Sequence, residues 1–336
     1  MRYFADYLTA HGIPWTHDIE MTSAYDILFL NSWTIPFPKV LKAKRNNPKL
    51  RVVQRVDGAA QDYGRTDGVD WIQRDVNRLA DLTIYQSQYS YNATHKRYHL
   101  IETPGPIIHN PVDVQRFSPD GECFDWKPKI RRVISVGWSP NPLKGNWRIP
   151  ILAKANPDIE FVVVGRAAGL ENLPGIRQIE YLDHERLPVA LRSADMYLSL
   201  IENDACPNVI LEALASGLPV LYIPSGGVPE LVRDAGLPFA QDSEFAPQLE
   251  RLFANHAEYA QKARQIALEH HQFDDVFSRY LKAIAACERR AMPPRKNIWQ
   301  GNLDTVMFNA GEQARKWKRI LTGKQSLRRP EPEHRF

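Results

Sequence analysis

The chain has 336 residues, of which 43 are Lys or Arg and 39 are Asp or Glu, so its formal net charge is +4. No apolar run reaches membrane-spanning length, and the first residues lack the pattern of a signal peptide. Three widely spaced cysteines, Cys123, Cys206 and Cys287, predict a reducing compartment and argue against a disulfide scaffold or a cysteine metal site.

The length alone predicts two domains. The first half opens with a helix over residues 2–11, which Gly12 ends, and strands then alternate with helices. Such alternation predicts a parallel sheet with right-handed crossovers. Strands are expected at 25–30, 51–56 and 81–85, helices at 39–45 and 71–80, and a further segment at 106–109.

Polar residues stand at the carboxyl ends of these predicted segments, namely Asn31, Asp57, Gln86 and Asn110. Ligands of a parallel sheet lie beyond the carboxyl ends of its strands. These side chains are therefore candidates for ligand contact.

A polar, irregular stretch over residues 120–129 predicts a linker, and a second alternating series follows it. Its strands are expected at 132–137, 159–165, 178–181, 195–200 and 218–223, which makes a doubly wound unit. The loop from Gly137 to Gly145 lacks the Gly-x-Gly-x-x-Gly pattern, so a dehydrogenase is not favoured.

The stretch from Asn203 to Val220 predicts a polar turn, a short helix and a buried strand. Pro207 suits the first helical position, and Gly217 suits the residue after the helix. The N–H groups of Asn208 and Val209 would then lack partners inside the helix, and the helix dipole would favour a phosphate there. Glu212 shares a helical face with Asn208, and Asp204 lies in the turn before them.

This stretch resembles the pair of carboxylates, spaced by seven residues, of the retaining GT-B glycosyltransferases of family 4 (glycosyl transferases group 1). The resemblance implies an α/β fold of two Rossmann-like domains facing across a cleft. It places an acceptor-side domain at 1–122, a nucleotide-sugar donor domain at 123–275, and a crossover helix with a basic tail at 276–336. In the family the first acid meets the donor sugar and the second meets the ribose, which assigns these roles to Asp204 and Glu212.

Two loops extend the resemblance. Lys144-Gly145 matches a family lysine that neutralises the donor diphosphate, whereas Trp138 replaces the usual Arg. Arg148 and Arg166 are candidates for the missing charge, and Arg166 is also expected near the nucleobase. The run Ser225 to Glu230 matches the family's Gly-Gly-x-Pro-Glu loop, in which Gly226 and Gly227 let the backbone approach the donor closely.

Two departures from the family accompany these matches. Many members have a His where this chain has Asn31, so an acceptor role borrowed from that His does not carry over directly. The family opens with a strand and a glycine-rich loop, whereas this chain begins at the following helix. Either the sequence starts late or this branch dispenses with that strand.

The predicted enzyme is a retaining hexosyltransferase that needs no metal and no cofactor beyond its nucleoside diphosphate sugar. The alternatives are an inactive GT-B protein that binds nucleotide sugars, another GT-B enzyme such as a sugar-nucleotide epimerase, and a nucleic-acid binder acting through the tail. The predicted catalytic residues are Lys144 and Asp204; the donor-binding residues are Gly137, Arg166, Asn208, Val209, Glu212, Gly226 and Gly227; and the acceptor-side residues are Asn31 and Asp57.

The charge is concentrated at the end of the chain. Residues 289–336 hold twelve Lys and Arg against four Asp and Glu, and the remainder holds 31 against 35. A body without excess positive charge argues against nucleic acid, and a helix over 309–321 with a basic face predicts contact with anionic membrane lipid. We expect a cytoplasmic protein that also acts at the inner face of the membrane, on a glycan or lipid-linked acceptor, in polysaccharide or glycoconjugate synthesis.

Overall fold

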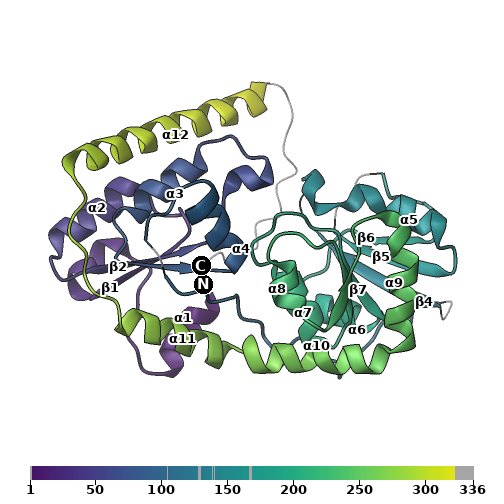
Figure 1. The fold of residues 1–336 in the computed structure, drawn as a ribbon. Helices are drawn as coiled ribbons and strands as arrows, with labels where there is room; N and C mark the ends of the chain where they lie inside the picture. The colour runs from purple at the N-terminus through teal and green to yellow at the C-terminus, as the bar shows by residue number, and fades with distance from the viewer. Residues whose placement is uncertain are drawn as a thin grey trace. The chain divides into compact units, whose positions relative to one another are not determined.

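The computed structural model describes residues 2–103, 105–127, 130–137, 139, 141–165 and 169–321. The chain forms two compact units (Figure 1). The first unit contains the residues up to Tyr85, Tyr91–Ile107 and the residues from Leu281 on, and the second contains Gln86–Ser90 and Ile108–Tyr280. The predicted domain limits 1–122, 123–275 and 276–336 differ from this division, which passes to the second unit at Ile108 and returns to the first at Leu281. These limits stay predictions.

The first unit is built on a three-stranded parallel sheet in the order β1-β2-β3. Its strands are β1 (Ile27–Asn31), β2 (Arg51–Val56) and β3 (Leu82–Tyr85), as the sequence predicts to within two residues. Ile107 adds a single parallel bridge to Tyr85, so the segment 106–109 forms no further strand of its own.

The helices of the first unit pack their apolar faces against this sheet. Leu30 and Val52 on the strands meet Phe37, Val40 and Val76 on two helices, all of them buried. The helical elements are α1 (Arg2–Ala10), η1 (Ile19–Ala24), α2 (Phe37–Asn46), η2 (Ala60–Tyr63), α3 (Val69–Asn77), the π-helical η3 (Asn92–Arg97) and α12 (Arg295–Leu321).

A buried ion pair fastens this unit together. Lys44 Nζ on α2 lies 2.7 Å from both carboxylate oxygens of Asp81, which comes just before β3. The same carboxylate accepts hydrogen bonds from the N–H groups of Val52 and Arg290, at 2.7 and 2.6 Å. Asp81 therefore connects a helix, a strand and the returning end of the chain.

The second unit contains a six-stranded parallel sheet in the order β6-β5-β4-β7-β8-β9. The alternating pattern of the sequence predicts all of these strands except the last, whose Gly and Pro residues disfavour a strand. They are β4 (Arg131–Val136), β5 (Ile159–Val164), β6 (Ile176–Ile179), β7 (Met196–Ser199), β8 (Val220–Tyr222) and β9 (Gly236–Pro238).

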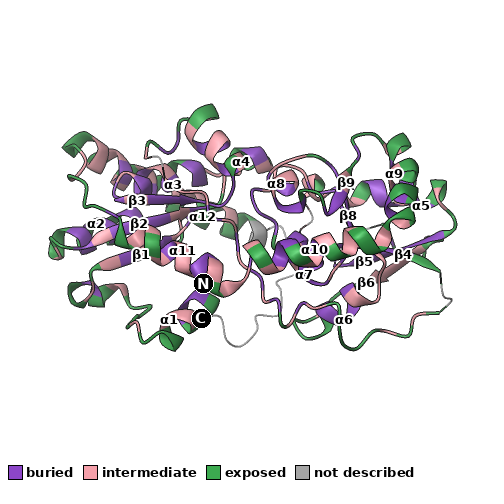
Figure 2. Cartoon of the chain, turned by 60° about the horizontal axis from the view of Figure 1, so that its bottom comes forward, coloured by how far each residue is buried: buried purple, intermediate pink, exposed green. Residues whose placement is uncertain are grey.

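Both faces of this sheet are covered, because successive strand residues enter opposite cores. On β5, for example, Phe161 and Val163 join one core and Val162 and Val164 join the other. The central strands are accordingly buried along their length (Figure 2). The helical elements are α4 (Gln88–Tyr91), η4 (Pro142–Lys144), η5 (Asn146–Arg148), α5 (Ile149–Ala155), α6 (Arg186–Arg192), α7 (Asn208–Ala215), α8 (Val228–Val232), α9 (Asp242–Ala254) and α10 (His256–His270), with α11 (Phe273–Ala285) leading back to the first unit.

The strand order places a topological switch point between β4 and β7. After β4 the chain proceeds outward through β5 and β6, and it then returns to the other side of β4 with β7 and β8. Loops that leave two adjacent strands in opposite directions open a crevice at their carboxyl ends, which is where such sheets bind ligands. The loops after β4 and β7 are those that carry Lys144 and Asp204.

Candidate active site

Lys144 and Asp204 form an ion pair at this switch point. Lys144 ends η4, whose start is capped by Asn141 Oδ1, which accepts a hydrogen bond from Leu143 N at 3.0 Å. Its Nζ lies 3.0 Å from Asp204 Oδ2, and each side chain is about one-fifth exposed. The next residue, Gly145, has φ +74°, and a Cβ there would lie 2.4 Å from Leu200 O. Glycine thus allows the β4 loop to lie against the β7 loop.

The turn that carries Asp204 is held from two sides. Glu202 N donates to Leu143 O at 2.8 Å, and Asn203, with φ +59°, donates its N–H to Ser225 Oγ at 3.0 Å. Asp204 Oδ1 accepts from Cys206 N at 3.3 Å. Since the other carboxylate oxygen meets Lys144, the orientation of Asp204 is fixed.

The glycine pair after β8 packs backbone against backbone on the same turn. Gly227 N donates to Asp204 O at 2.8 Å. A Cβ on Gly226 would lie 2.2 Å from Asp204 O, and one on Gly227 would lie 2.0 Å from Ala205 O. The structure therefore brings three stretches that the sequence analysis singled out, around Lys144, Asp204 and Gly226, to one place.

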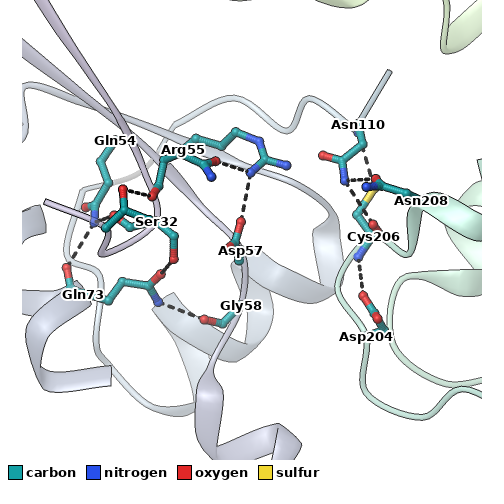
Figure 3. Close-up of polar contacts among 12 residues, drawn as sticks. Ser32, Gln54, Arg55, Asp57, Gly58, Gln73, Asn110, Asp204, Cys206 and Asn208 are labelled. Atoms are coloured by element: carbon teal, nitrogen blue, oxygen red, sulfur yellow. Dashed lines mark hydrogen bonds and ion pairs between the residues drawn. The ribbon is translucent and has the colours of Figure 1, made fainter. Parts of the chain in front are cut away.

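Helix α7 begins at Asn208, one residue later than the sequence predicts, because Pro207 has extended backbone angles and serves as the cap. Within the described residues no acceptor meets the N–H groups of Asn208 and Val209. The side chain of Asn208 is engaged, since its Oδ1 accepts from Asn110 Nδ2 at 2.7 Å (Figure 3). Asn110 also donates to Cys206 O at 3.1 Å. The start of α7 thus presents backbone donors on a fixed base.

Glu212 lies one turn further along α7. Burial raises its pKa to about 7. The buried Tyr197 of β7 interacts electrostatically with Glu212 and Asp204, and its hydroxyl lies close to the backbone of Val136. Burial also raises the pKa of Tyr197. Sequence analysis missed this residue, whose signal was a tyrosine hydroxyl inside a buried strand.

Glu230, at the end of the glycine loop, has a structural role. Its carboxylate accepts hydrogen bonds from the N–H groups of Gln88 and Tyr89, at 2.7 and 2.8 Å, and lies 3.4 Å from His109 Nε2. Burial would raise the pKa of Glu230, but these hydrogen bonds outweigh burial and lower it. Glu230 therefore fastens residues 86–90 within the second unit.

The remaining donor-side candidates are placed differently. Gly137 follows β4, donates its N–H to Val164 O at 2.9 Å, and has its carbonyl against Gly165. Arg148, a candidate for the missing loop charge, is engaged in an ion pair with Asp242 and lies over the ring of Phe239. Arg166 and Trp138 lie outside the described residues.

The acceptor-side candidates of the first unit share one partner. Arg55 Nη1 donates to Asn31 Oδ1 at 2.7 Å. It also donates to Asp57 Oδ1 at 2.9 Å (Figure 3). Sequence analysis missed Arg55, although an arginine near the end of a buried strand is unusual and was a usable signal. Its guanidinium holds the ends of β1 and β2 together.

Buried amide groups support these strand ends. Gln54 donates to Ser32 O at 3.0 Å, Ser32 Oγ donates to Gln73 Oε1 at 3.1 Å, and Gln73 donates to Gly58 O at 2.8 Å (Figure 3). Such a network fixes the loops that carry Asn31 and Asp57.

The described residues contain no group of three or more His, Cys, Asp or Glu side chains placed to hold a metal ion. A polar pocket of about 200 Å³ lies in the first unit, between the end of α3 and the segment before α12, and none of the predicted site residues lines it. Arg74, Arg78 and Arg290 contribute to its wall.

The segment that carries most of this site matches a known protein family. Residues 147–255 match the family model of the glycosyl transferases group 1. That segment contains Asp204, Asn208, Glu212 and both loop glycines, and it begins three residues after Lys144. The resemblance stated from the sequence is thereby confirmed.

One curated relative is the GDP-mannose-dependent alpha-mannosyltransferase of Mycobacterium tuberculosis (strain CDC 1551 / Oshkosh). It is 30% identical over 200 residues, which cover 55% of this chain and 51% of that protein. The chain thus spans about half the length of this relative.

Two solved structures illustrate the fold. Sucrose-phosphate synthase from Thermosynechococcus elongatus has a TM-score of 0.64 and 16% identity, over 84% of this chain and 77% of that one. HepE from Anabaena, in complex with UDP, has a TM-score of 0.61 and 17% identity, over 84% of this chain and 89% of that one. The α/β fold with two parallel sheets is therefore GT-B, as the sequence predicts.

Proposed function

We propose, from the match of residues 147–255 to the group 1 glycosyltransferases, that this chain moves a hexosyl unit from a nucleoside diphosphate sugar to a hydroxyl acceptor with retention at the anomeric carbon. The observation that carries the proposal is the Lys144–Asp204 pair at the β4/β7 switch point, beside the donor-rich start of α7. A cation, a carboxylate and backbone N–H groups at one crevice fit a sugar joined to a diphosphate.

The nucleotide would be held by α7. The N–H groups of Asn208 and Val209, together with the helix dipole, suit a phosphate oxygen. Glu212, four residues further on the same face, suits the paired hydroxyls of the ribose. Gly226 and Gly227 let their loop pack directly on the turn that carries Asp204, which would hold that turn beside the donor.

The chemical step would depend on Lys144. As the bond between the sugar and the diphosphate breaks, negative charge grows on the leaving phosphate, and a positioned ammonium group stabilises that charge. The diphosphate must then compete with Asp204 for Lys144. Asp204 would exchange part of its contact with Lys144 for hydroxyls of the sugar and so orient it.

Proton transfer requires no dedicated base in this scheme. The acceptor hydroxyl attacks on the face that the diphosphate leaves, and the departing phosphate oxygen takes its proton. The sugar–oxygen bond to phosphate breaks, the bond to the acceptor forms, and the configuration is retained. The ammonium group of Lys144 and the N–H groups at the start of α7 would take the place of a metal ion.

Acceptor binding is proposed for Asn31 and Asp57, which Arg55 holds together. The acceptor would be a glycan or lipid-linked sugar of polysaccharide or glycoconjugate synthesis, at the inner face of the membrane. None of the helices in the described chain is both long and apolar enough to cross a bilayer. Membrane contact would come from the basic end of the chain.

The first test is a binding panel with UDP, GDP and ADP and their common hexose conjugates, measured by calorimetry. Because one relative is named as GDP-mannose-dependent and one solved relative was crystallised with UDP, those two bases lead the panel. Binding of one nucleotide that is lost in Glu212→Ala, but kept in the exposed-surface control Glu185→Ala, would support the donor site. No binding to any nucleotide would contradict it.

The alternative is a GT-B protein that binds nucleotide sugars without turnover. Trp138 in place of the family arginine favours it, because an indole supplies no charge to the leaving group. Donor binding with neither transfer nor slow hydrolysis would establish this alternative. A sugar-nucleotide epimerase would instead convert the donor without any acceptor.

A further inference from the structure

Helix α12 carries an unusual concentration of exposed apolar side chains. Five of the thirteen large apolar side chains that are exposed in the described chain lie on it. Trp299, Val306, Met307 and Trp317 are each more than 60% exposed, and Leu303 is 39% exposed. We call these five residues the α12 outer ridge.

The ridge residues share one face of the helix because of their spacing. Trp299, Leu303, Val306 and Trp317 follow one another at intervals of four, three and eleven residues, which keeps them on one face of an α-helix. Met307 adjoins them. At about 1.5 Å per residue, the two tryptophans stand about 27 Å apart along the helix.

The opposite face of α12 is packed on its own unit, which fixes the direction of the ridge. Gly301 lies so close to α2 that a Cβ would come 2.8 Å from the ring of Phe37. Phe308 meets Trp33 edge to face at 5.6 Å, and Asp304 is paired with Arg74 of α3 at 2.8 Å. Figure 1 shows α12 running along α2 and α3.

The acidic and basic residues of α12 differ in their surroundings. Its acids are Asp304, paired with Arg74, and Glu312, paired with Arg315 on the helix itself. Lys296 stands near the first tryptophan, and Lys316 and Lys318 stand beside the last. The ridge is therefore flanked by cations at both ends, while each acid already has a basic partner.

We propose that the α12 outer ridge binds the surface of an anionic lipid bilayer, with the helix lying in the plane of the interface. Tryptophans favour the headgroup level, aliphatic side chains between them enter the acyl boundary, and lysines at both ends meet anionic headgroups. The proposal deepens the proposed function by assigning its membrane contact to a folded surface that begins before the predicted 309–321 helix. It rests on that function only for the purpose of the contact, since binding itself needs neither donor nor acceptor.

A second copy of the chain fits this surface less well. A two-fold pairing along α12 would place the basic ends of the two helices together in either orientation, so that like charges meet. A bilayer with anionic lipid supplies opposite charge along the whole length of the helix.

The test is co-sedimentation of the full chain with vesicles of phosphatidylcholine alone or with 30% phosphatidylglycerol, without nucleotide. We expect binding to the anionic vesicles, accompanied by a blue shift of tryptophan emission. Trp299→Ser with Trp317→Ser should weaken this binding about tenfold or more. Trp147→Ser is the matched control, because Trp147 is 59% exposed but lies in the second unit and should leave binding unchanged.

A charge variant separates the two contributions. Lys296→Gln, Lys316→Gln and Lys318→Gln together should remove most of the preference for anionic over neutral vesicles, about fivefold per lysine at low salt. Thermal unfolding of each variant checks that it folds.

Three outcomes would overturn the proposal. They are no binding of the unaltered chain to anionic vesicles, equal binding by the ridge variant, and a self-association in ultracentrifugation that the ridge variant abolishes. Nucleotide calorimetry on the same ridge variant keeps the two proposals distinct. Loss of vesicle binding with nucleotide affinity retained concerns the ridge alone.

Discussion

Lys144 Nζ lies 3.0 Å from Asp204 Oδ2, although sixty positions separate the two residues in the chain. The pair joins the loops that leave β4 and β7 at the switch point of the six-stranded sheet. Each residue thereby neutralises the other, so a diphosphate that approaches Lys144 meets a cation already paired with a carboxylate. This relationship gives the two proposed catalytic residues opposite effects on nucleotide affinity.

Asp204→Ala should strengthen binding of the nucleoside diphosphate and lower turnover. A partly exposed ion pair contributes about 1 kcal/mol, and the diphosphate no longer has to overcome that free energy once Asp204 is removed. Nucleotide affinity should therefore increase about fivefold. Lys144→Ala should lower turnover about 100-fold or more, because charge on the leaving phosphate loses its stabilising group. Calorimetry and initial rates on both variants measure these effects.

The double variant supplies the control for this interpretation. With Lys144 already replaced, Asp204→Ala should no longer improve nucleotide affinity. An equal gain in both backgrounds would mean that Asp204 repels the diphosphate directly and does not act by occupying Lys144.

Nucleotide affinity should increase with pH. Burial raises the pKa of Glu212 to about 7, and ribose hydroxyls donate to the carboxylate form, so binding favours loss of the proton. If only the carboxylate binds, affinity at pH 6 should be about tenfold lower than at pH 8. Calorimetry across this range should show the dependence, and Glu212→Gln should give weak binding that is independent of pH.

Replacing the Glu212 carboxyl by an amide should also stabilise the folded chain. The unfolded chain gives up this proton near the ordinary pKa of 4.5, whereas the folded chain gives it up near 7. The folded state therefore loses stability as pH rises from 4.5 to 7, and the loss is complete above 7. At pH 8 the free energy of unfolding of Glu212→Gln should exceed that of the parent by about 1 to 3 kcal/mol. At pH 4 the two proteins should show no such difference.

Gly226→Ala should damage the site more than a matched glycine substitution elsewhere. A Cβ on Gly226 would lie 2.2 Å from Asp204 O, so the turn that carries Asp204 must shift. Gly169 has a similar φ, +82° against +64°, but open space around it. Gly169→Ala should cost only the backbone strain of about 1 kcal/mol, whereas Gly226→Ala should also reduce turnover at least tenfold. Similar rates for the two variants would contradict the packing argument.

The ion pair between Lys44 and Asp81 should dominate the stability of the first unit. Lys44→Met leaves a buried carboxylate without its cation, which costs about 3 to 5 kcal/mol. Lys42→Met on the same helix breaks a pair with Glu20 whose two side chains are both 62% exposed, and it should cost less than about 1 kcal/mol. Denaturant unfolding of the two variants makes the comparison, and equal midpoints would refute it.

Local patterns were sufficient for most of the secondary structure. Short apolar runs that alternate with helical segments predicted β1 to β8, because side chains on both faces of these strands enter a core. Gly217, with φ +73°, ends α7 as expected. The pattern failed for β9, which is three residues long and contains Gly and Pro, and for the first half of α12. Residues 295–308 have little intrinsic helical preference, and their helix is stabilised by packing on α2 and α3.

The sequence by itself determined that the fold alternates strands and helices, that Lys144, Asp204 and Glu212 were candidates, and that the end of the chain is basic. Only the tertiary structure decided that Lys144 pairs with Asp204, that Glu230 fastens residues 86–90, and that Arg55 joins Asn31 to Asp57. Periodicity reports which face of an element is buried, whereas these partners depend on the order of strands in a sheet. That order is set by the packing of segments far apart in the chain, and no local window of residues contains it.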